Sequence, residues 1–426
     1  MSAPGALQSP SDPAPGPRVP ALDAVRAGAM LLGVVLHACA PYMHVPMRGL
    51  VMPVQEPATS RAPDAVFWLL HAFRVPAFFV VAGCVARQLL ARRGPAEFLR
   101  NRWRRVGLVL LVAYPLVTLA MYPTWLWGWV SRGWASWGHL FALKYGPELQ
   151  RAVWGFNQLW FLEYLLIYCL ALWAWERWRS RHAPDDPAAP APLRPAPSLA
   201  WQSGLGLLNL AVPIACITFW PAWYVDFRNA YLPHPPALVY YAMFFLLGVR
   251  LARTGLDALA RVAPLLLLAG LALVAPYLKT IFSQVRETMH GLRQGVPESL
   301  HDRALLALTS TGVAFAWSLG FLGLAARLVG RPGRLARVLT DASYWVYLTH
   351  LVWVGLGVML LHRYVPAPIP GGGGVVLGPE ARTLVVATFA AALSLATFVP
   401  VRGTRLGRWL GGSPGPGARV PPGRGA

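Results

Sequence analysis

The chain has 426 residues, of which 56% are hydrophobic and only 13% are charged. A soluble domain carries about 25% charged residues, so the composition argues against one and is typical of a polytopic membrane protein. The formal charge of +21 would favour nucleic-acid binding on a soluble surface. Here the basic residues cluster between apolar runs, as in cytoplasmic membrane loops, so the lipid bilayer is the expected partner and nucleic acid is not.

Ten apolar segments are long enough to cross a bilayer, for which a helix needs about 20 residues. They cover roughly 22–43, 65–87, 106–130, 155–176, 199–220, 236–252, 262–282, 303–326, 340–362 and 381–401. No β-barrel alternation is visible, so the sequence predicts an all-α, polytopic integral membrane bundle of about ten transmembrane helices. We expect a disordered N-terminal segment (1–20), a ten-helix membrane domain (21–410) and a disordered C-terminal tail (411–426).

Arginines alternate between the predicted loops. The segment 87–105, RQLLARRGPAEFLRNRWRR, has seven arginines against one acid, Glu97. Arginine-rich loops also follow the fourth, sixth and eighth predicted helices, whereas the intervening loops are poorer in basic residues or balanced. The positive-inside rule therefore predicts that both termini lie in the cytoplasm.

The first predicted helix, LDAVRAGAMLLGVVLHA (22–38), carries ionisable groups that are costly inside a bilayer. Arg26 and His37 lie about 20° from the same angular position and roughly 16 Å apart along the axis, so they share one face. Asp23 precedes Arg26 by three residues and can pair with it. The spacing leaves two interpretations open. Either Arg26 and His37 are functional residues, or His37 is a core histidine with its hydrogen bonds made and the Asp23–Arg26 pair only anchors the helix in the membrane.

Three further ionisable residues fall in the second and fourth predicted helices. His71 lies near the outer boundary of the second helix, Arg74 is about one turn deeper, and Glu163 has a similar depth in the fourth. An unpaired buried charge is very costly, so we predict that Arg74 and Glu163 form a salt bridge. Such a pair is either structural or catalytic.

Two more motifs also have a structural interpretation. His350 lies near the middle of the ninth helix, with Tyr344 and Tyr347 on overlapping faces, and a lone histidine on an apolar helix is more often structural. The arginines at the cytoplasmic entrance of the third helix fit either positive-inside topology or the binding of an anionic cytosolic ligand such as a phosphate. These are Arg100, Arg102, Arg104 and Arg105.

Metal and nucleotide motifs are absent from the sequence. The ten histidines form no HExxH or similar cluster, and no Walker A or GxGxxG motif opens a helix. The four cysteines lie in apolar segments without ligand spacing and are expected to be small buried hydrophobes. We therefore expect no metal and no tightly bound cofactor.

Five blocks, in order, resemble the membrane acyltransferase-3 superfamily, and in particular its branch thought to succinylate periplasmic glucans. They are the 22–38 block, HAFRVPAFFVVAG (71–83), NRWRRVGLVLLVAYPL (101–116), LWFLEYLLIY (159–168) and ASYWVYLTHLVWV (342–354). The sequence departs from the branch at Gln158, where a histidine is expected, at Val109, where a proline is usual, and at Glu163, where the branch is apolar.

The resemblance implies transfer of a succinyl or acetyl group from cytosolic acyl-CoA to a hydroxyl of an extracytoplasmic glycan. By position, His37 matches the family's essential histidine, Arg26 its motif partner, His71 and Arg74 a His-x-x-Arg motif, and His350 a late-helix histidine. Arg102 and Arg105 match a paired-arginine motif. The resemblance also implies a multi-pass protein of the bacterial inner membrane, with acyl-CoA, a glycan acceptor and glucan-synthesis proteins as partners.

A sugar hydroxyl needs a positioned base, and imidazole suits that task. We expect His37 to act as that base while Arg74 stabilises the oxyanion, Arg26 orients the donor or the helix, and Arg102 and Arg105 hold CoA phosphates. A covalent acyl-histidine is an open alternative. A transporter of a small anionic or acylated substrate would also place ionisable residues on several membrane helices, although no inverted repeat is visible.

Overall fold

The computed structural model describes residues 19–142, 144–146, 149–150, 153–182, 199–294, 299–330, 333–365 and 377–409. Within these ranges the chain is helical, with two isolated β-bridges and no strand. Disorder was expected over 1–20 and 411–426, and these segments lie outside the described ranges except for Val19 and Pro20, the N-cap and the first residue of a helix.

A long helix coincides with each predicted span. These helices are α1 (Pro20–Cys39), α2 (Arg61–Arg102), α3 (Leu108–Ser131), α6 (Trp160–Arg181), α7 (Leu199–Phe219), α9 (Pro235–Thr254), α10 (Asp257–Gln294), α11 (Leu300–Leu328), α12 (Arg334–Tyr364) and α13 (Pro379–Val401). Shorter helical turns are η1 (Ala40–Tyr42), η2 (Trp103–Gly107), α4 (His139–Ala142), η3 (Asn157–Leu159), α8 (Ala222–Val225) and α14 (Arg405–Trp409).

Among the described residues, eight helical stretches are long and apolar enough to cross a membrane. One of them, Arg61–Ser131, contains the second and third predicted spans, and the fifth predicted span contains a shorter apolar helix, Gly206–Phe219. The all-α, polytopic architecture expected from composition is therefore confirmed.

The outer surface of the bundle is apolar, whereas polar side chains point inward. Leucines on the outward faces of α3 and α10 are more than half exposed; they include Leu111, Leu116, Leu119, Leu265, Leu268 and Leu271. An exposed apolar surface of this extent suits contact with lipid. The four cysteines are buried and unpaired, as expected of small hydrophobes.

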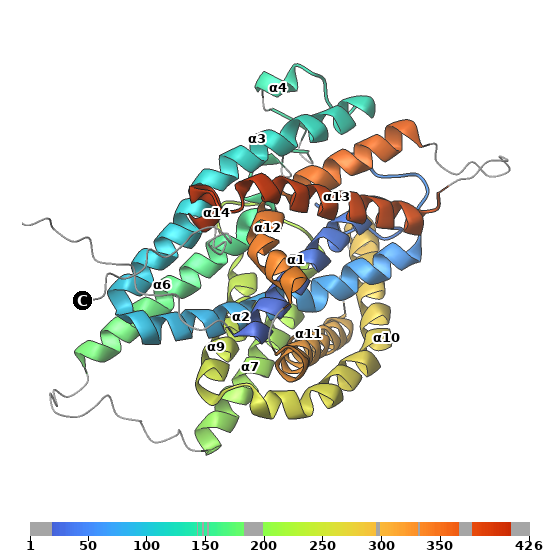
Figure 1. Ribbon diagram of the computed structural model, residues 1–426. Helices are drawn as coiled ribbons and strands as arrows, with labels where there is room; N and C mark the ends of the chain where they lie inside the picture. The colour runs from blue at the N-terminus through green and yellow to red at the C-terminus, as the bar shows by residue number, and fades with distance from the viewer. Residues whose placement is uncertain are drawn as a thin grey trace, which may run out of the picture.

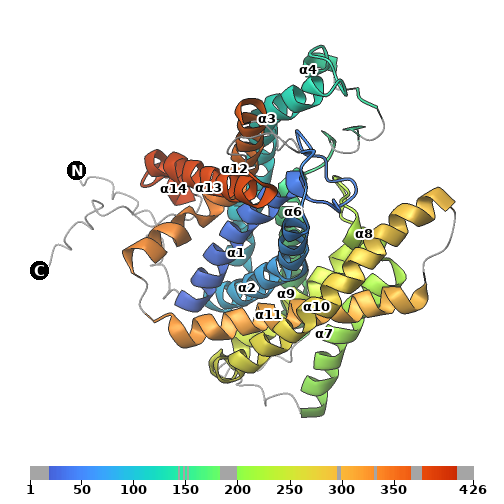
Figure 2. The same ribbon diagram turned by 90° about the vertical axis from the view of Figure 1, so that its right-hand side faces the viewer.

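Helix α1 lies in the middle of the bundle, in contact with α2, α11, α12 and α13 (Figure 1). Helices α10 and α11 pack along each other on one side of it (Figure 2). The backbones of helices α2 and α9 are in direct contact at two glycines, Gly83 and Gly248. A Cβ on Gly83 would lie 2.0 Å from the Phe245 carbonyl oxygen, and a Cβ on Gly248 would lie 2.0 Å from the Val80 carbonyl oxygen. Small residues allow such close packing in membranes.

The arginine-rich segment 87–105 is helical rather than the loop that we expected. Helix α2 is interrupted only at Gly94, whose φ of 72° is accessible to glycine, and Pro95 starts the next helical segment. The π-helical turn Trp103–Gly107 then leads into α3. We call the end of the bundle that carries Arg100–Arg105 the basic end, and the other end the far end.

The segment between α1 and α2, residues 43–60, covers the far end and is fixed by buried contacts. The Glu56 carboxylate lies 2.9 Å from His362 Nδ1 and 3.6 Å from Arg382 Nη1. Trp125 Nε1 donates to the Val51 carbonyl oxygen at 3.0 Å. Because these partners come from α3, α12 and α13, the segment joins three helices that are distant in sequence.

Candidate functional site

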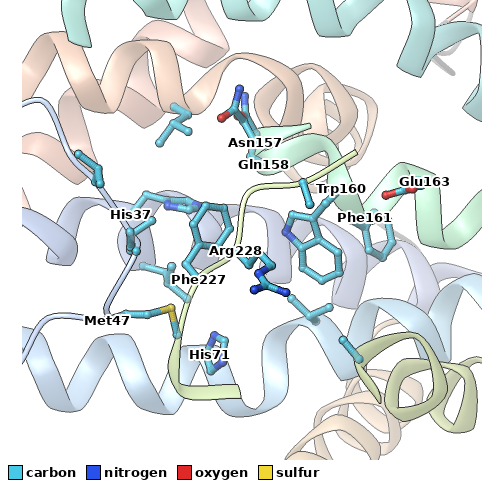
Figure 3. A pocket seen from close by; sticks show the side chains of 18 of the residues that line it. His37, Met47, His71, Asn157, Gln158, Trp160, Phe161, Glu163, Phe227 and Arg228 are labelled. Atoms are coloured by element: carbon cyan, nitrogen blue, oxygen red, sulfur yellow. The ribbon is translucent and has the colours of Figure 1, made fainter. Parts of the chain in front are cut away.

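A cavity of about 500 Å³ at the far end brings together five of the predicted site residues. They are His37, His71, Arg74, Glu163 and His350, from α1, α2, α6 and α12. The 43–60 segment and the residues preceding α9 complete its walls. Figure 3 shows His37 and Glu163 on opposite sides of this cavity. We call it the far cavity.

A second cavity, of about 390 Å³, lies toward the basic end and contains three further predicted residues, Arg26, Arg102 and Arg105. We call it the basic cavity. Arg100 and Arg104 line neither cavity; Arg100 is exposed and pairs with Glu97 at 2.7 Å. Of the four arginines predicted to bind phosphate, Arg102 and Arg105 therefore line a cavity, whereas Arg100 and Arg104 do not.

Four side chains line both cavities and lie between them: Met30, Phe78, Phe161 and Tyr347. We call these four residues the septum. The rings of Phe78 and Phe161 are 5.5 Å apart between centroids, and those of Phe161 and Tyr347 are 6.1 Å apart. The septum is therefore an apolar layer between a basic compartment and an imidazole-rich one.

Helix α1 connects the two cavities with one face. Arg26 lines the basic cavity, Met30 lines both, and His37 lines the far cavity, which confirms that Arg26 and His37 share a face. Arg26 pairs with Asp23 at 3.2 Å, as the spacing indicated, and its Nη2 donates to the Thr340 carbonyl oxygen at 3.5 Å.

The three cavity histidines differ in their hydrogen bonds. His350 Nδ1 lies 2.9 Å from the Tyr347 carbonyl oxygen, and His71 Nε2 lies 3.2 Å from that of Tyr224. A carbonyl oxygen only accepts, so each of these nitrogens carries the hydrogen, and the lone pair of the neutral ring is on the other nitrogen. His37, in contrast, makes no hydrogen bond with any described residue, and its buried Nδ1 has no partner there.

The rings of His37 and His350 are neighbours, with centroids 5.3 Å apart and planes inclined by 43°. His350 Nε2, the nitrogen that bears the lone pair, is buried and has no hydrogen-bond partner among the described residues. An N–H of His37 that turns toward this nitrogen would be oriented by it. His350 is therefore placed to orient His37, as a second group commonly orients a catalytic base.

The predicted salt bridge between Arg74 and Glu163 is wrong: both described side chains line one cavity, but they form no ion pair with each other. The Arg74 guanidinium lies against α1, because a Cβ on Gly33 would be only 2.3 Å from its Nη1. Glu163 lies on the opposite side from His37 (Figure 3). The prediction failed because similar depth in two helices does not fix the direction in which their side chains point.

In the basic cavity, Arg102 and Arg105 both make contacts that hold them in place. Arg102 Nη2 donates to Asn101 Oδ1 at 2.7 Å, and the guanidinium carbon lies 6.0 Å from the centroid of the Phe98 ring. The Arg105 carbonyl oxygen accepts a hydrogen bond from the Tyr344 hydroxyl at 2.9 Å. Arg26, Arg102 and Arg105 all line this cavity, and clustered guanidinium groups suit a phosphate-bearing ligand.

The wall of the far cavity near Glu163 combines aromatic and charged groups. Trp160 and Arg228 lie between His37 and Glu163 in Figure 3. The pKa of His234, on the same wall, is lowered by burial and by the nearby charge of Arg228. Burial and the nearby charge of Arg228 therefore both favour the neutral form of His234.

The septum residues were not among the predicted site residues. Met30, Phe78 and Phe161 are apolar residues in apolar segments, so nothing in the sequence distinguishes them from the core. Tyr347 carries the one available signal, a polar group at helical spacing from His350, and its hydroxyl donates to the Gln158 carbonyl oxygen at 2.8 Å.

Comparison with known proteins identifies the family. The acyltransferase-3 family model, described as an acyltransferase domain, matches residues 19–401. Similar curated proteins include the glucans biosynthesis protein C of Escherichia coli O17:K52:H18, 26% identical over 284 residues, which are 64% of this chain and 62% of the relative. That of Salmonella typhimurium is 31% identical over 189 residues, 41% of this chain and 44% of the relative.

The chain thus spans between about two fifths and three fifths of the length of these relatives. No solved structure is significantly similar. The family match extends over both cavities and the septum, from the start of α1 to the end of α13. The chain therefore belongs to the acyltransferase-3 family of multi-pass membrane acyltransferases.

Proposed function

We propose that this protein transfers an acyl group from cytosolic acyl-CoA to a hydroxyl of an extracytoplasmic glycan, with His37 as the general base. The observation that carries the proposal is the presence of two cavities on one face of α1. The basic cavity suits the phosphates of CoA, the far cavity suits an acceptor, and the four septum residues line both cavities.

The donor would enter from the basic end, which the positive-inside rule assigns to the cytoplasm. Arg102 and Arg105 would hold the CoA phosphates, and Arg26 would guide the pantetheine arm into the bundle. The thioester would then reach His37 by displacing septum side chains, none of which carries a charge.

At His37, the acceptor hydroxyl would lose its proton to the imidazole as its oxygen attacks the thioester carbonyl carbon. Arg74 would stabilise the negative charge that develops on the carbonyl oxygen. The carbon–sulfur bond then breaks, and the leaving thiolate takes the proton from His37, so the products are an ester and free CoA. The absence of a hydrogen bond from His37 to any described residue supports this role, because His71 and His350 each donate to a carbonyl oxygen.

The acceptor is proposed to be a periplasmic glucan or related glycan, because the curated relatives are named for glucan biosynthesis. The acyl group is proposed to be succinyl or acetyl, as the family resemblance implies. The bacterial inner membrane is the corresponding location, and glucan-synthesis proteins are the corresponding partners. Mass spectrometry of glycans from cells with and without the protein identifies the acyl group from the mass added.

The test is acyl-CoA turnover by purified protein in lipid, measured as free CoA thiol, with wild type compared with H37A. General base catalysis contributes about 10²–10⁴-fold, so we expect H37A to lose at least about a hundredfold in kcat while remaining folded and inserted. Near-normal turnover by H37A would remove His37 from the mechanism. A transporter would move its substrate without releasing CoA.

A further inference from the structure

Gly33 lies on the face of α1 that connects the two cavities. It follows Arg26 by seven residues and precedes His37 by four, spacings that keep all three on one side of a helix. An ideal Cβ on Gly33 would lie 2.3 Å from Arg74 Nη1 and 3.4 Å from Arg74 Cζ. The Arg74 guanidinium therefore occupies the space that any side chain at position 33 would fill.

The guanidinium held in this way lies in the region where the reaction is proposed to occur. It is about one turn from His37 along α1, on the side of the septum. Arg74 makes no ion pair or hydrogen bond with any described residue, and its buried Nε has no partner there. Its position is therefore fixed by the surface it rests on rather than by a polar partner.

We propose that Gly33 is a positioning residue: the absence of a side chain at position 33 sets the Arg74 guanidinium against α1, within reach of a thioester carbonyl beside His37. This inference rests on the proposed function. A methyl group at position 33 would push the guanidinium away from the helix by about 1 Å, because the 2.3 Å approach to Nη1 must widen to an ordinary contact. Misplacement of about 1 Å is enough to impair a catalytic group.

The experiment compares G33A with G28A in lipid-reconstituted protein. Gly28 is a matched control, because it lies on the same helix and a Cβ there would meet nothing within 4 Å. We expect G28A to behave like wild type. G33A should lose about ten- to a hundredfold in kcat, toward the 10²–10³ lost when an oxyanion donor is removed. The KM for acyl-CoA should be unchanged, because the basic cavity is untouched.

An R74K background tests whether the effect passes through Arg74. Lysine ends in a single ammonium group and leaves room for a methyl group at position 33, so G33A should then change kcat by less than about twofold. The melting temperature gives a readout independent of activity. Alanine favours a helix over glycine, so G33A should raise the melting temperature in an R74A background by more than it does when Arg74 is present.

Equal losses in the Arg74 and R74K backgrounds, or a G33A variant as active as G28A, would overturn the inference while leaving the proposed function intact. A wild-type protein that consumes no acyl-CoA would instead refute the proposed function. In that case, the melting temperatures of G33A with and without Arg74 would still show whether a side chain at position 33 displaces the Arg74 guanidinium.

Discussion

The two interpretations of the arginine-rich segment 87–105 can be separated by comparing two of its arginines. If the segment served topology alone, Arg100 and Arg102 would be equivalent, because they are two residues apart in one helical segment. The structure makes them different: Arg102 lines the basic cavity, whereas Arg100 is exposed and pairs with Glu97. We therefore predict that R102A and R100A have unequal effects on the donor.

A hydrogen bond to a charged group contributes about 1.5–3 kcal/mol. Since each 1.4 kcal/mol corresponds to a factor of about ten, R102A should raise the KM for acyl-CoA by about ten- to a hundredfold. Arg100 takes part in an exposed ion pair worth about 0–1 kcal/mol and touches no cavity, so R100A should leave the KM within about twofold.

The assay is initial-rate release of free CoA from lipid-reconstituted protein at several acyl-CoA concentrations, with melting temperatures to confirm that both variants are folded. Raising the salt concentration should increase the wild-type KM, because screening weakens phosphate contacts. If R102A and R100A had the same KM, the basic cavity would not be the donor site, and the topological interpretation would suffice.

Two further predictions concern the septum and the 43–60 segment. Without acceptor, F161A should release CoA severalfold faster than wild type, because water from the far cavity gains access to the thioester. If F161A released CoA no faster than wild type under these conditions, the septum would not act as a barrier. E56A should leave the buried Arg382 without its carboxylate and cost about 3–5 kcal/mol of stability, seen as a lower melting temperature. The exposed Glu97 provides the control, since E97A should cost less than about 1 kcal/mol; equal shifts would contradict the prediction.

Hydropathy and helical periodicity were sufficient to predict the long apolar helices and the shared face of Arg26 and His37. These features depend on local sequence: a span needs a run of apolar residues, and two positions on a helix share a face whatever surrounds it. The grouping of His37, His71, Arg74 and His350 in one site was expected only from the family resemblance. Spacing within one helix does not show which helices pack together.

The features that sequence did not predict depend on packing between distant elements. Gly33 resembles any glycine in a membrane helix until Arg74 is placed beside it. The ion pair of Glu56 with Arg382 joins positions more than three hundred residues apart. Arg382 did offer a signal, since an arginine at the start of the tenth predicted span requires a buried partner or an interface, but the sequence does not say that Glu56 supplies it.

The most direct test of the account places the two substrates on opposite sides of a membrane. Vesicles containing the protein would receive acyl-labelled CoA on the side of the basic end and a glycan acceptor on the side of the far end. We predict that the label appears on the acceptor across the membrane, with one CoA thiol released for each acyl group transferred. Labelling that occurs only when both substrates share one side would contradict a path through the two cavities.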